Sequence, residues 1–255
     1  MKTDIITILR RKLYCFLFLK RLHPTDPAFE LHFSKKNKYL SCLISKNGCS
    51  SILSSILKYD FNEEIDETKK IWDQKDSWVK HKDEHKILFN HNEKIDLTPF
   101  ADYRKFVVLR HPLDRFISFI NNTYKEKEYD YLFDKSLSPE KYVDSVLNLY
   151  PYMIDYKRKD MRFDKHAIPQ RVYYEKYKEI FGNDLEIVIL KDLSEFYEKL
   201  TGVSLIKNNI TKDSEKICAK ETLTKNQQEK INEFLAEYEF YKDDEYAQLF
   251  QKKII

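Results

Sequence analysis

Two kinds of hydrophobic pattern alternate along this chain of 255 residues. Short, nearly continuous apolar runs predict buried strands, because a parallel strand covered on both faces needs apolar side chains on both sides. Such runs lie at 39–44, 104–110 and 185–190, and residues 86–90 are predicted to form a further short strand. Elsewhere apolar residues recur about every three or four positions, as on one face of a helix. The helical patterns cover 50–59, 112–125, 138–150, 170–182 and a last stretch that opens at Thr224.

Helix start and stop signals agree with this division. Pro112 and the pair Ser138-Pro139 suit helix beginnings, because proline lacks an amide that the first turn would leave unpaired and serine can cap that turn. Gly182 suits a helix end, since glycine readily adopts the left-handed conformation found there. Strands that alternate with helices predict an α/β fold, with a largely parallel, P-loop-like sheet flanked by helices.

The first 35 residues are predicted to form a helical extension, and residues 36–255 a single domain. The apolar run Leu13–Leu19 lies between basic residues and is far shorter than the roughly 20 residues of a membrane span. No small-residue cleavage site follows it, so a signal peptide is not expected. Two interpretations stay open: a helix docked on the domain, or a basic amphipathic helix in peripheral contact with a membrane or a partner enzyme.

Composition narrows the classes of protein. The 45 basic and 42 acidic side chains give a net charge of +3, so a nucleic-acid partner is not expected. An acidic small ligand would need only a local basic pocket. The cysteines Cys15, Cys42, Cys49 and Cys218 show neither a zinc-binding spacing nor a disulfide framework, which indicates a reducing, cytoplasmic location. Frequent lysine, asparagine and isoleucine indicate an AT-rich bacterial genome.

One of the three glycines lies where a predicted strand meets a predicted helix. The segment reads Lys46, Asn47, Gly48, Cys49, Ser50 and Ser51. A helix N-terminus attracts anions, because its first amides lack intrahelical acceptors and the helix dipole favours negative charge. Glycine lets the backbone approach a ligand closely, and the serines add donors. Alone, the segment fits either a phosphate site or a serine-capped helix with an exposed lysine.

A second basic motif follows the strand at 104–110. Arg110 ends that strand, and ligands collect at the carboxyl ends of strands in open α/β sheets. Arg115, Ser118 and Asn122 follow at helical spacing, so they share one face of the next helix. A guanidinium and a hydroxyl together can hold a phosphate group. The alternative is that Arg110 pairs with a carboxylate at the edge of the sheet.

Together the two motifs resemble the sulfotransferases that use 3′-phosphoadenosine 5′-phosphosulfate (PAPS). The resemblance is closest to the carbohydrate branch, which includes chondroitin, dermatan and uronosyl 2-O-sulfotransferases. It implies transfer of a sulfuryl group to a hydroxyl of a carbohydrate or polysaccharide, without a metal ion. It also implies that residues 46–51 cradle the 5′-phosphosulfate, and that Arg110 and Ser118 hold the 3′-phosphate.

The resemblance extends over most of residues 39–250 through the similar stretches 164–170 and 188–200 and the C-terminal helical region. There are two departures from the family pattern. Ser45 stands where the family usually has a proline, and Ala167 stands where a tryptophan often follows the histidine of the third motif. Backbone amides and a lysine would carry the first site in spite of the missing proline.

The expected chemistry needs charge stabilisation and a base. Sulfuryl transfer, like phosphoryl transfer, is an in-line displacement in which the protein mainly positions the reactants and stabilises charge. Lys46 is expected to neutralise the leaving oxygen, and a histidine or carboxylate to accept the proton of the acceptor hydroxyl.

Several residues are candidates for this base. His91 is the first, because it directly follows a predicted strand and the uronosyl branch has a histidine at the end of a comparable strand. His166 is the second, either as the base or as a residue that orders the acceptor. His85 and Glu84 are further alternatives, whereas His111 is expected to pack beside the site.

Two other classes of function stay open. A P-loop kinase or nucleotide hydrolase would place its lysine after a second glycine and an acidic magnesium ligand where Arg110 stands. A non-catalytic domain that binds a nucleotide or glycan could have the same fold, since fold does not determine function. Dependence on magnesium would distinguish the kinase from the sulfotransferase.

Overall fold

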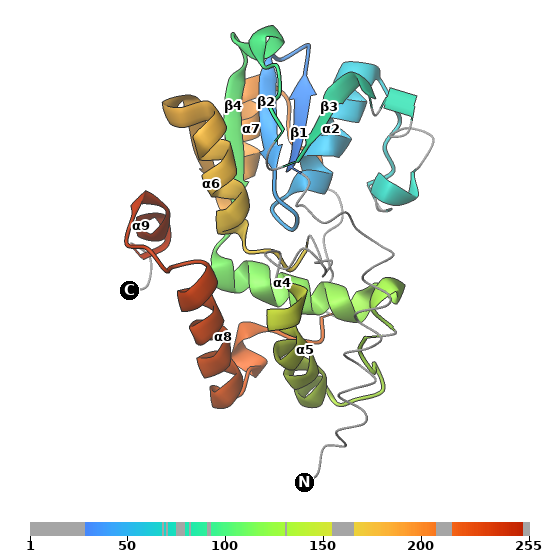
Figure 1. The fold of residues 1–255 in the computed structure, drawn as a ribbon. Helices are drawn as coiled ribbons and strands as arrows, with labels where there is room; N and C mark the ends of the chain where they lie inside the picture. The colour runs from blue at the N-terminus through green and yellow to red at the C-terminus, as the bar shows by residue number, and fades with distance from the viewer. Residues whose placement is uncertain are drawn as a thin grey trace. The chain divides into compact units, whose positions relative to one another are not determined.

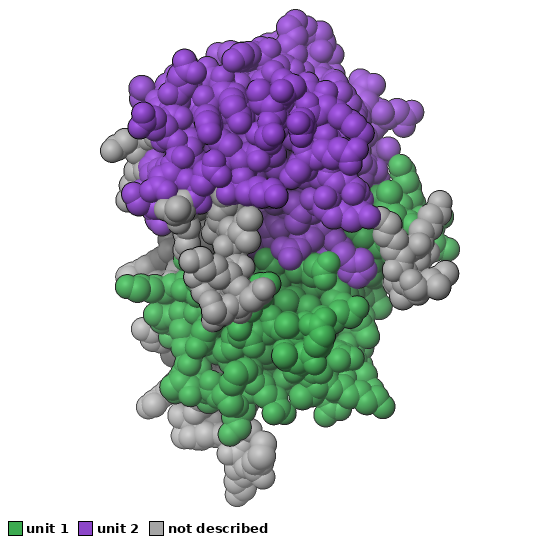
Figure 2. All heavy atoms as spheres, turned by 180° about the vertical axis from the view of Figure 1, so that it is seen from behind, with its two compact units in different colours: residues 1–27, 112–169, 213–255 green, residues 28–111, 170–212 purple. Residues whose placement is uncertain are grey.

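The computed structural model describes residues 29–67, 69, 71–74, 80–81, 83–90, 93–130, 132–154, 166–207 and 216–251. Within these ranges the backbone falls into two compact units, coloured separately in Figure 2. The first takes in the described residues of 112–169 and 213–255, and the second those of 28–111 and 170–212. The single domain expected from residue 36 onward stays a prediction.

A five-stranded sheet forms the centre of the second unit (Figure 1). Its strands are β1 (Phe29–Ser34), β2 (Tyr39–Leu43), β3 (Lys86–Phe89), β4 (Arg104–Leu109) and β5 (Leu185–Ile189), in the order β3-β1-β2-β4-β5. β2, β4 and β5 are parallel, whereas β1 is antiparallel to both β2 and β3. The predicted α/β fold and its four predicted strands are confirmed, although β3 is only partly buried, and the unexpected strand β1 makes the sheet mixed.

Strand β1 also corrects the predicted boundary of the N-terminal extension. Residues 29–34 were expected to belong to a helical extension, and they pair with β2 and β3 instead. The rest of that extension, including the basic segment around Leu13–Leu19, lies outside the described residues. No helix in the described ranges has the length and hydrophobicity needed to cross a bilayer.

The sheet unit includes the helices α2 (Cys49–Phe61), α6 (Gln170–Phe181) and α7 (Leu193–Thr201). α2 and α7 cover one face, where one apolar cluster joins both helices to the sheet. Its members include Tyr39, Leu43, Ile52, Ile56, Phe106, Val108, Leu193 and Tyr197. Side chains alternate between the faces of a strand, so Cys42 points to the other side. α6 lies on that side, towards the viewer in Figure 1.

Tyr177 joins α6 to the two strands that precede the Lys46 segment. Its buried hydroxyl donates to the carbonyl of Leu43 at 2.8 Å and accepts from the amide of Glu30 at 3.2 Å. Its ring packs edge-on against Phe29 with 5.8 Å between centroids. Burial raises the pKa of this phenol well above its ordinary value, so it stays a neutral hydrogen-bonding group. α6 is thereby held against the end of β2.

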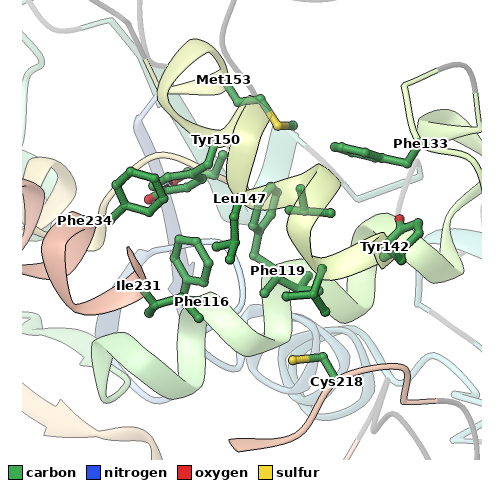
Figure 3. Close-up of a cluster of buried hydrophobic side chains, with 14 of the residues drawn as sticks. Phe116, Phe119, Phe133, Tyr142, Leu147, Tyr150, Met153, Cys218, Ile231 and Phe234 are labelled. Atoms are coloured by element: carbon green, nitrogen blue, oxygen red, sulfur yellow. Dashed lines mark hydrogen bonds between the residues drawn. The ribbon is translucent and has the colours of Figure 1, made fainter. Parts of the chain in front are cut away.

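The other unit is helical in its described part. It contains α4 (Pro112–Lys125), α5 (Pro139–Met153), α8 (Lys225–Tyr238) and α9 (Glu245–Gln251). Aromatic side chains of α4, α5 and α8 fill its core, as Figure 3 shows for Phe116, Tyr150 and Phe234. The predicted helix starts at Pro139 and just after Thr224 are confirmed. Short 3₁₀ segments in the two units cover Ile71–Asp73, Thr98–Phe100, Lys127–Tyr129, Gly182–Asp184, Leu190–Asp192 and Lys220–Thr222.

Candidate active site

The segment between β2 and α2 has an unusual backbone. Lys46 and Gly48 both have positive φ angles, 72° and 84°, while Asn47 between them does not. Alternation of left-handed and ordinary conformations turns successive backbone amides towards one point, and such nests bind anions. A lysine in the left-handed region also carries backbone strain, which proteins retain mainly at functional sites. The local geometry therefore supports the anion site expected from the sequence.

Gly48 is required at its position for two reasons. Its φ of 84° is unfavourable for any residue with a Cβ atom, and a Cβ would lie 2.9 Å from Cδ2 of Leu193 and 3.0 Å from Cδ1 of Leu190. Gly48 is also the N-cap of α2, where no side chain makes a capping hydrogen bond. With no side-chain cap, the first turn of α2 leaves the amides of Cys49 and Ser50 for another acceptor, as an anion-binding helix start would.

The side chains that follow Gly48 differ in their surroundings. Cys49 is half-buried and packs against the apolar cluster between the sheet, α2 and α7, which is the role of a small hydrophobic residue. Ser50 is buried, and Ser51 is partly exposed. The amides of Ser51 and Ile52 both lie within hydrogen-bond distance of the Gly48 carbonyl, at 3.1 and 3.2 Å.

Asn47 faces the protein interior. Its buried side-chain amide donates to the carbonyl of Val108 at 2.8 Å and to Oε1 of Gln170 at 2.8 Å. Asn47 was predicted to line the donor site with the rest of the segment. In the structure its side chain joins the segment to β4 and to the start of α6, and a contact of Asn47 with the donor stays a prediction.

Arg110 follows β4 at the same edge of the sheet as the Lys46 segment, because β2 and β4 are parallel neighbours. Its Nη1 lies 3.4 Å from the carbonyl oxygen of Lys46. The predicted proximity of the two motifs is therefore seen for Lys46 and Arg110. The alternative, a pairing of Arg110 with a carboxylate, stays open. Arg104, at the start of the same strand, binds Glu186 through two hydrogen bonds of 2.8 and 2.7 Å.

Gln170 is a site residue that the sequence reasoning missed. Its buried side chain accepts from the amide of Arg110 at 3.2 Å and donates to the Arg110 carbonyl at 2.5 Å, besides the contact with Asn47. It ends the stretch 164–170 that supported the family resemblance, but only His166 in that stretch had been considered. Its position directly after Pro169, at a helix start, reveals neither its burial nor its partners.

The remaining residues of the second motif belong to the helical unit. Ser118 is partly exposed on α4. Arg115, on the same helix, is buried, and its Nη2 lies 3.4 Å from the carbonyl oxygen of His166. Arg110 and Ser118 fall in different units, so their joint binding of one phosphate stays a prediction.

A family model described as the sulfotransferase family matches residues 30–185, more than half of the chain. The chain belongs to the sulfotransferase family. The family predicted from the two motifs is confirmed, whereas the carbohydrate branch stays a prediction. No curated protein and no solved structure matches the chain significantly.

The topology of this sulfotransferase separates the candidates for the base. β3 runs in the same direction as β2 and β4, since both intervening pairings are antiparallel. The chain that follows Phe89 therefore leaves the sheet at the edge where the Lys46 segment and Arg110 lie. His91 itself lies outside the described residues, and its role stays a prediction.

His85 and Glu84 precede β3 and lie away from that edge. Lys86 pairs with His32, which in turn pairs with Ser41 in the middle of β2. His85 is thus level with a point several residues before Lys46, and its buried Nδ1 donates to the carbonyl of His81 at 2.6 Å. The register excludes both residues as the base of a reaction at the Lys46 segment.

His166 lies in the helical unit and has a defined partner. Its Nδ1 is 3.3 Å from the hydroxyl of Tyr129. If Nδ1 donates to this oxygen, Nε2 is the nitrogen that can accept a proton. The role of His166 stays a prediction. In the described part of this sulfotransferase, no group of three or more His, Cys, Asp or Glu side chains could hold a metal ion.

The surroundings of His85 predict how stability depends on pH. Burial, together with the charges of His32, Lys86 and His81, lowers the pKa of His85 to about 4. The unfolded chain then binds more protons between that value and the ordinary pKa of about 6.5, so the folded state loses stability as pH falls through this range. We expect a loss of about 2 kcal/mol once solvent screening is allowed for.

Chemical denaturation of wild type and His85→Asn between pH 7 and 4 would measure this loss. The asparagine keeps a donor for the His81 carbonyl but cannot titrate. Glu30 gives an internal control in a different range. Burial alone would raise its pKa, but the hydrogen bond to His32 and the charges of His32 and Lys86 lower it to about 2, so its contribution is lost at more acidic pH. An unchanged pH slope in His85→Asn would contradict the assignment.

Proposed function

We propose that this protein transfers a sulfuryl group from PAPS to a hydroxyl group of a carbohydrate. The observation that carries the proposal is the left-handed backbone at Lys46 and Gly48, at the start of α2 where no side chain caps the helix, beside Arg110 at the same sheet edge. Family membership supports sulfuryl transfer in general. PAPS as the donor and a carbohydrate as the acceptor follow from the resemblance in the two motifs.

The features of the nest fit an anionic donor group. The alternating backbone conformations are those of an anion-binding nest, and without a Cβ atom Gly48 lets Leu190 and Leu193 pack close to the segment. Lys46 adds a positive charge in the same segment. A phosphosulfate, the mixed anhydride of phosphate and sulfate, carries several anionic acceptor oxygens that such donors can bind.

In this reaction the protein forms no covalent bond with the sulfuryl group. The bond between sulfur and the bridging phosphate oxygen breaks while a bond from sulfur to the acceptor oxygen forms, and the acceptor proton moves to a base. Negative charge grows on the leaving oxygen. Lys46 and the amides at the start of α2 would stabilise that charge, and Arg110 would fix the nucleotide portion of the donor.

A nucleotide kinase is the less favoured alternative. The residue that follows β4 is Arg110, whereas the magnesium site of P-loop enzymes uses an acidic residue from a neighbouring strand. The acceptor itself requires a direct experiment: a screen of mono-, oligo- and polysaccharides with sulfur-labelled PAPS. Transfer of label to a protein tyrosine or a steroid, with none to any carbohydrate, would contradict the proposed acceptor class.

Donor binding gives a test that needs no acceptor. The product 3′-phosphoadenosine 5′-phosphate (PAP) at about 100 times its Kd should stabilise the fold by about 2.7 kcal/mol and raise Tm by about 5–10 °C. ATP should shift Tm much less, because it lacks the 3′-phosphate for which Arg110 is proposed. Differential scanning fluorimetry with both ligands, with and without chelator, would measure this. Equal shifts from ATP and PAP would refute the proposed donor.

A further inference from the structure

A single buried amide connects the two motifs of the proposed donor site. Gln170 is the first residue of α6, and none of its surface is exposed to solvent. Its Oε1 lies within hydrogen-bond distance of Nδ2 of Asn47 (2.8 Å) and of the backbone amide of Arg110 (3.2 Å). Its Nε2 donates to the carbonyl of Arg110 at 2.5 Å. One side chain thus contacts both segments within the same unit.

The contact with Arg110 replaces a missing strand neighbour. The parallel pairing of β4 with β5 ends at Leu109 and Ile189, so sheet hydrogen bonds no longer fix the residue that follows. Gln170 binds both the N–H and the C=O of Arg110, as an adjacent strand would. This holds the backbone from which the Arg110 guanidinium extends.

The contact with Asn47 fixes the other segment. Both hydrogens of its side-chain amide have acceptors, Oε1 of Gln170 and the carbonyl of Val108, so the orientation of the amide is determined. Its Oδ1 is buried without a hydrogen-bond partner among the described residues. An unpaired buried acceptor lowers stability, which indicates that Asn47 is retained for the link and not for stability alone.

We infer that Gln170 is a positioning residue that holds the Lys46 segment and Arg110 at one separation. Because both anionic groups of the donor are parts of one molecule, a fixed separation lets the second group bind without a further ordering cost. The identity of the donor rests on the proposed function. The mechanical link between the segments rests on the hydrogen bonds alone.

The first test compares ligands that carry one or both anionic groups. Isothermal titration of adenosine 5′-phosphate and of PAP gives the gain in affinity due to the 3′-phosphate. Gln170→Met, which keeps the length of the side chain without its polar atoms, should reduce this gain about tenfold. Adenosine 5′-phosphate itself should bind with a smaller change. A gain equal to that of wild type would overturn the inference.

Gln227 offers a matched control. It is also a buried glutamine with three polar contacts, in the helical unit: it donates to the Glu140 carbonyl at 3.0 Å and to Asp144 at 2.8 Å, and accepts from the Thr224 amide at 3.0 Å. Gln227→Met should therefore lower Tm, and it should leave the gain from the 3′-phosphate within about twofold of wild type. A reduced gain in both variants would assign the effect to lost stability and overturn the inference.

A second measurement does not depend on the donor. In the ligand-free protein, amide hydrogen exchange of residues 44–52 and 108–112 should become faster together in Gln170→Met and remain unchanged in Gln227→Met. Asn47→Ala cuts the link on one side only and serves if Gln170→Met does not fold; it too should speed exchange in both segments. Faster exchange confined to one segment would overturn the link. Failure of wild type to bind PAP would instead refute the proposed donor.

Discussion

His91→Ala is expected to lower turnover by about 10²–10⁴-fold while leaving PAP affinity intact. Loss of the base affects only the step in which the acceptor proton is removed. The chain after β3 leaves the sheet at the edge of the Lys46 segment and Arg110, which is where the proton must be accepted. Since only a neutral imidazole accepts a proton, wild-type activity should also rise with increasing pH, and residual His91→Ala activity should lose this dependence.

His166 is the other candidate for the base, and variants of His166 and its partner Tyr129 test this alternative. His166→Ala and Tyr129→Phe should both keep turnover near wild type if His91 is the base. If His166 is the base, both should lower turnover, because the Tyr129 hydroxyl lies 3.3 Å from Nδ1 of His166 and would orient its ring. Saturation kinetics with PAPS and titration with PAP should be measured for all three variants. Loss of turnover in the His166 and Tyr129 variants alone would refute His91.

The second large effect concerns the different roles of Lys46 and Arg110, which are expected to act on turnover and on donor binding respectively. Lys46→Met should lower turnover by about 10²–10³-fold, with a smaller effect on PAP binding, because the charge of Lys46 matters most as the leaving oxygen becomes anionic. Arg110→Ala should mainly weaken donor binding, by roughly 2–4 kcal/mol. Steady-state kinetics at saturating PAPS, together with PAP titrations, would distinguish the two patterns.

The backbone at Lys46 supplies the control for this comparison. Its φ of 72° is strained for every residue except glycine, so Met and Arg at this position carry a similar conformational cost. Lys46→Arg keeps the charge and should retain more turnover than Lys46→Met. Equal turnover in these two variants would show that the charge is not used, and wild-type turnover in Lys46→Met would remove Lys46 from the mechanism.

Local patterns were sufficient to predict the parallel part of the fold and the strand-to-helix segment of the site. β2, β4 and β5 are short apolar runs, and Gly48 stands where only a residue without a side chain fits. Strand β1 was missed although Phe29, Leu31 and Phe33 alternate with polar residues. His32 and Ser34, at its polar positions, are buried as well. Burial of a polar side chain needs a hydrogen-bond partner, such as Asp60 for Ser34, and the local sequence does not reveal that partner.

Gln170 and the orientation of Asn47 could not be predicted for a different reason. Their hydrogen bonds join residues 60 to 123 positions apart in the chain. Each residue alone has the local appearance of a polar loop or helix-cap residue. The Gln170 side chain can bond to both Asn47 and Arg110 only because α6 lies close to the ends of β2 and β4. That position of α6 depends on the packing of the whole unit.

The division of the chain into interleaved units has a consequence for biosynthesis. The sheet unit is encoded by residues 28–111 and 170–212, with part of the helical unit between them. A nascent chain that has emerged as far as residue 169 has made β4 but neither β5 nor α6, so one side of an apolar strand still lacks its partner. Unpaired strand edges of this kind promote association between chains. A ribosome that stalls between residues 112 and 169 would therefore release an aggregation-prone fragment, and chaperone binding during translation should be strongest in this interval.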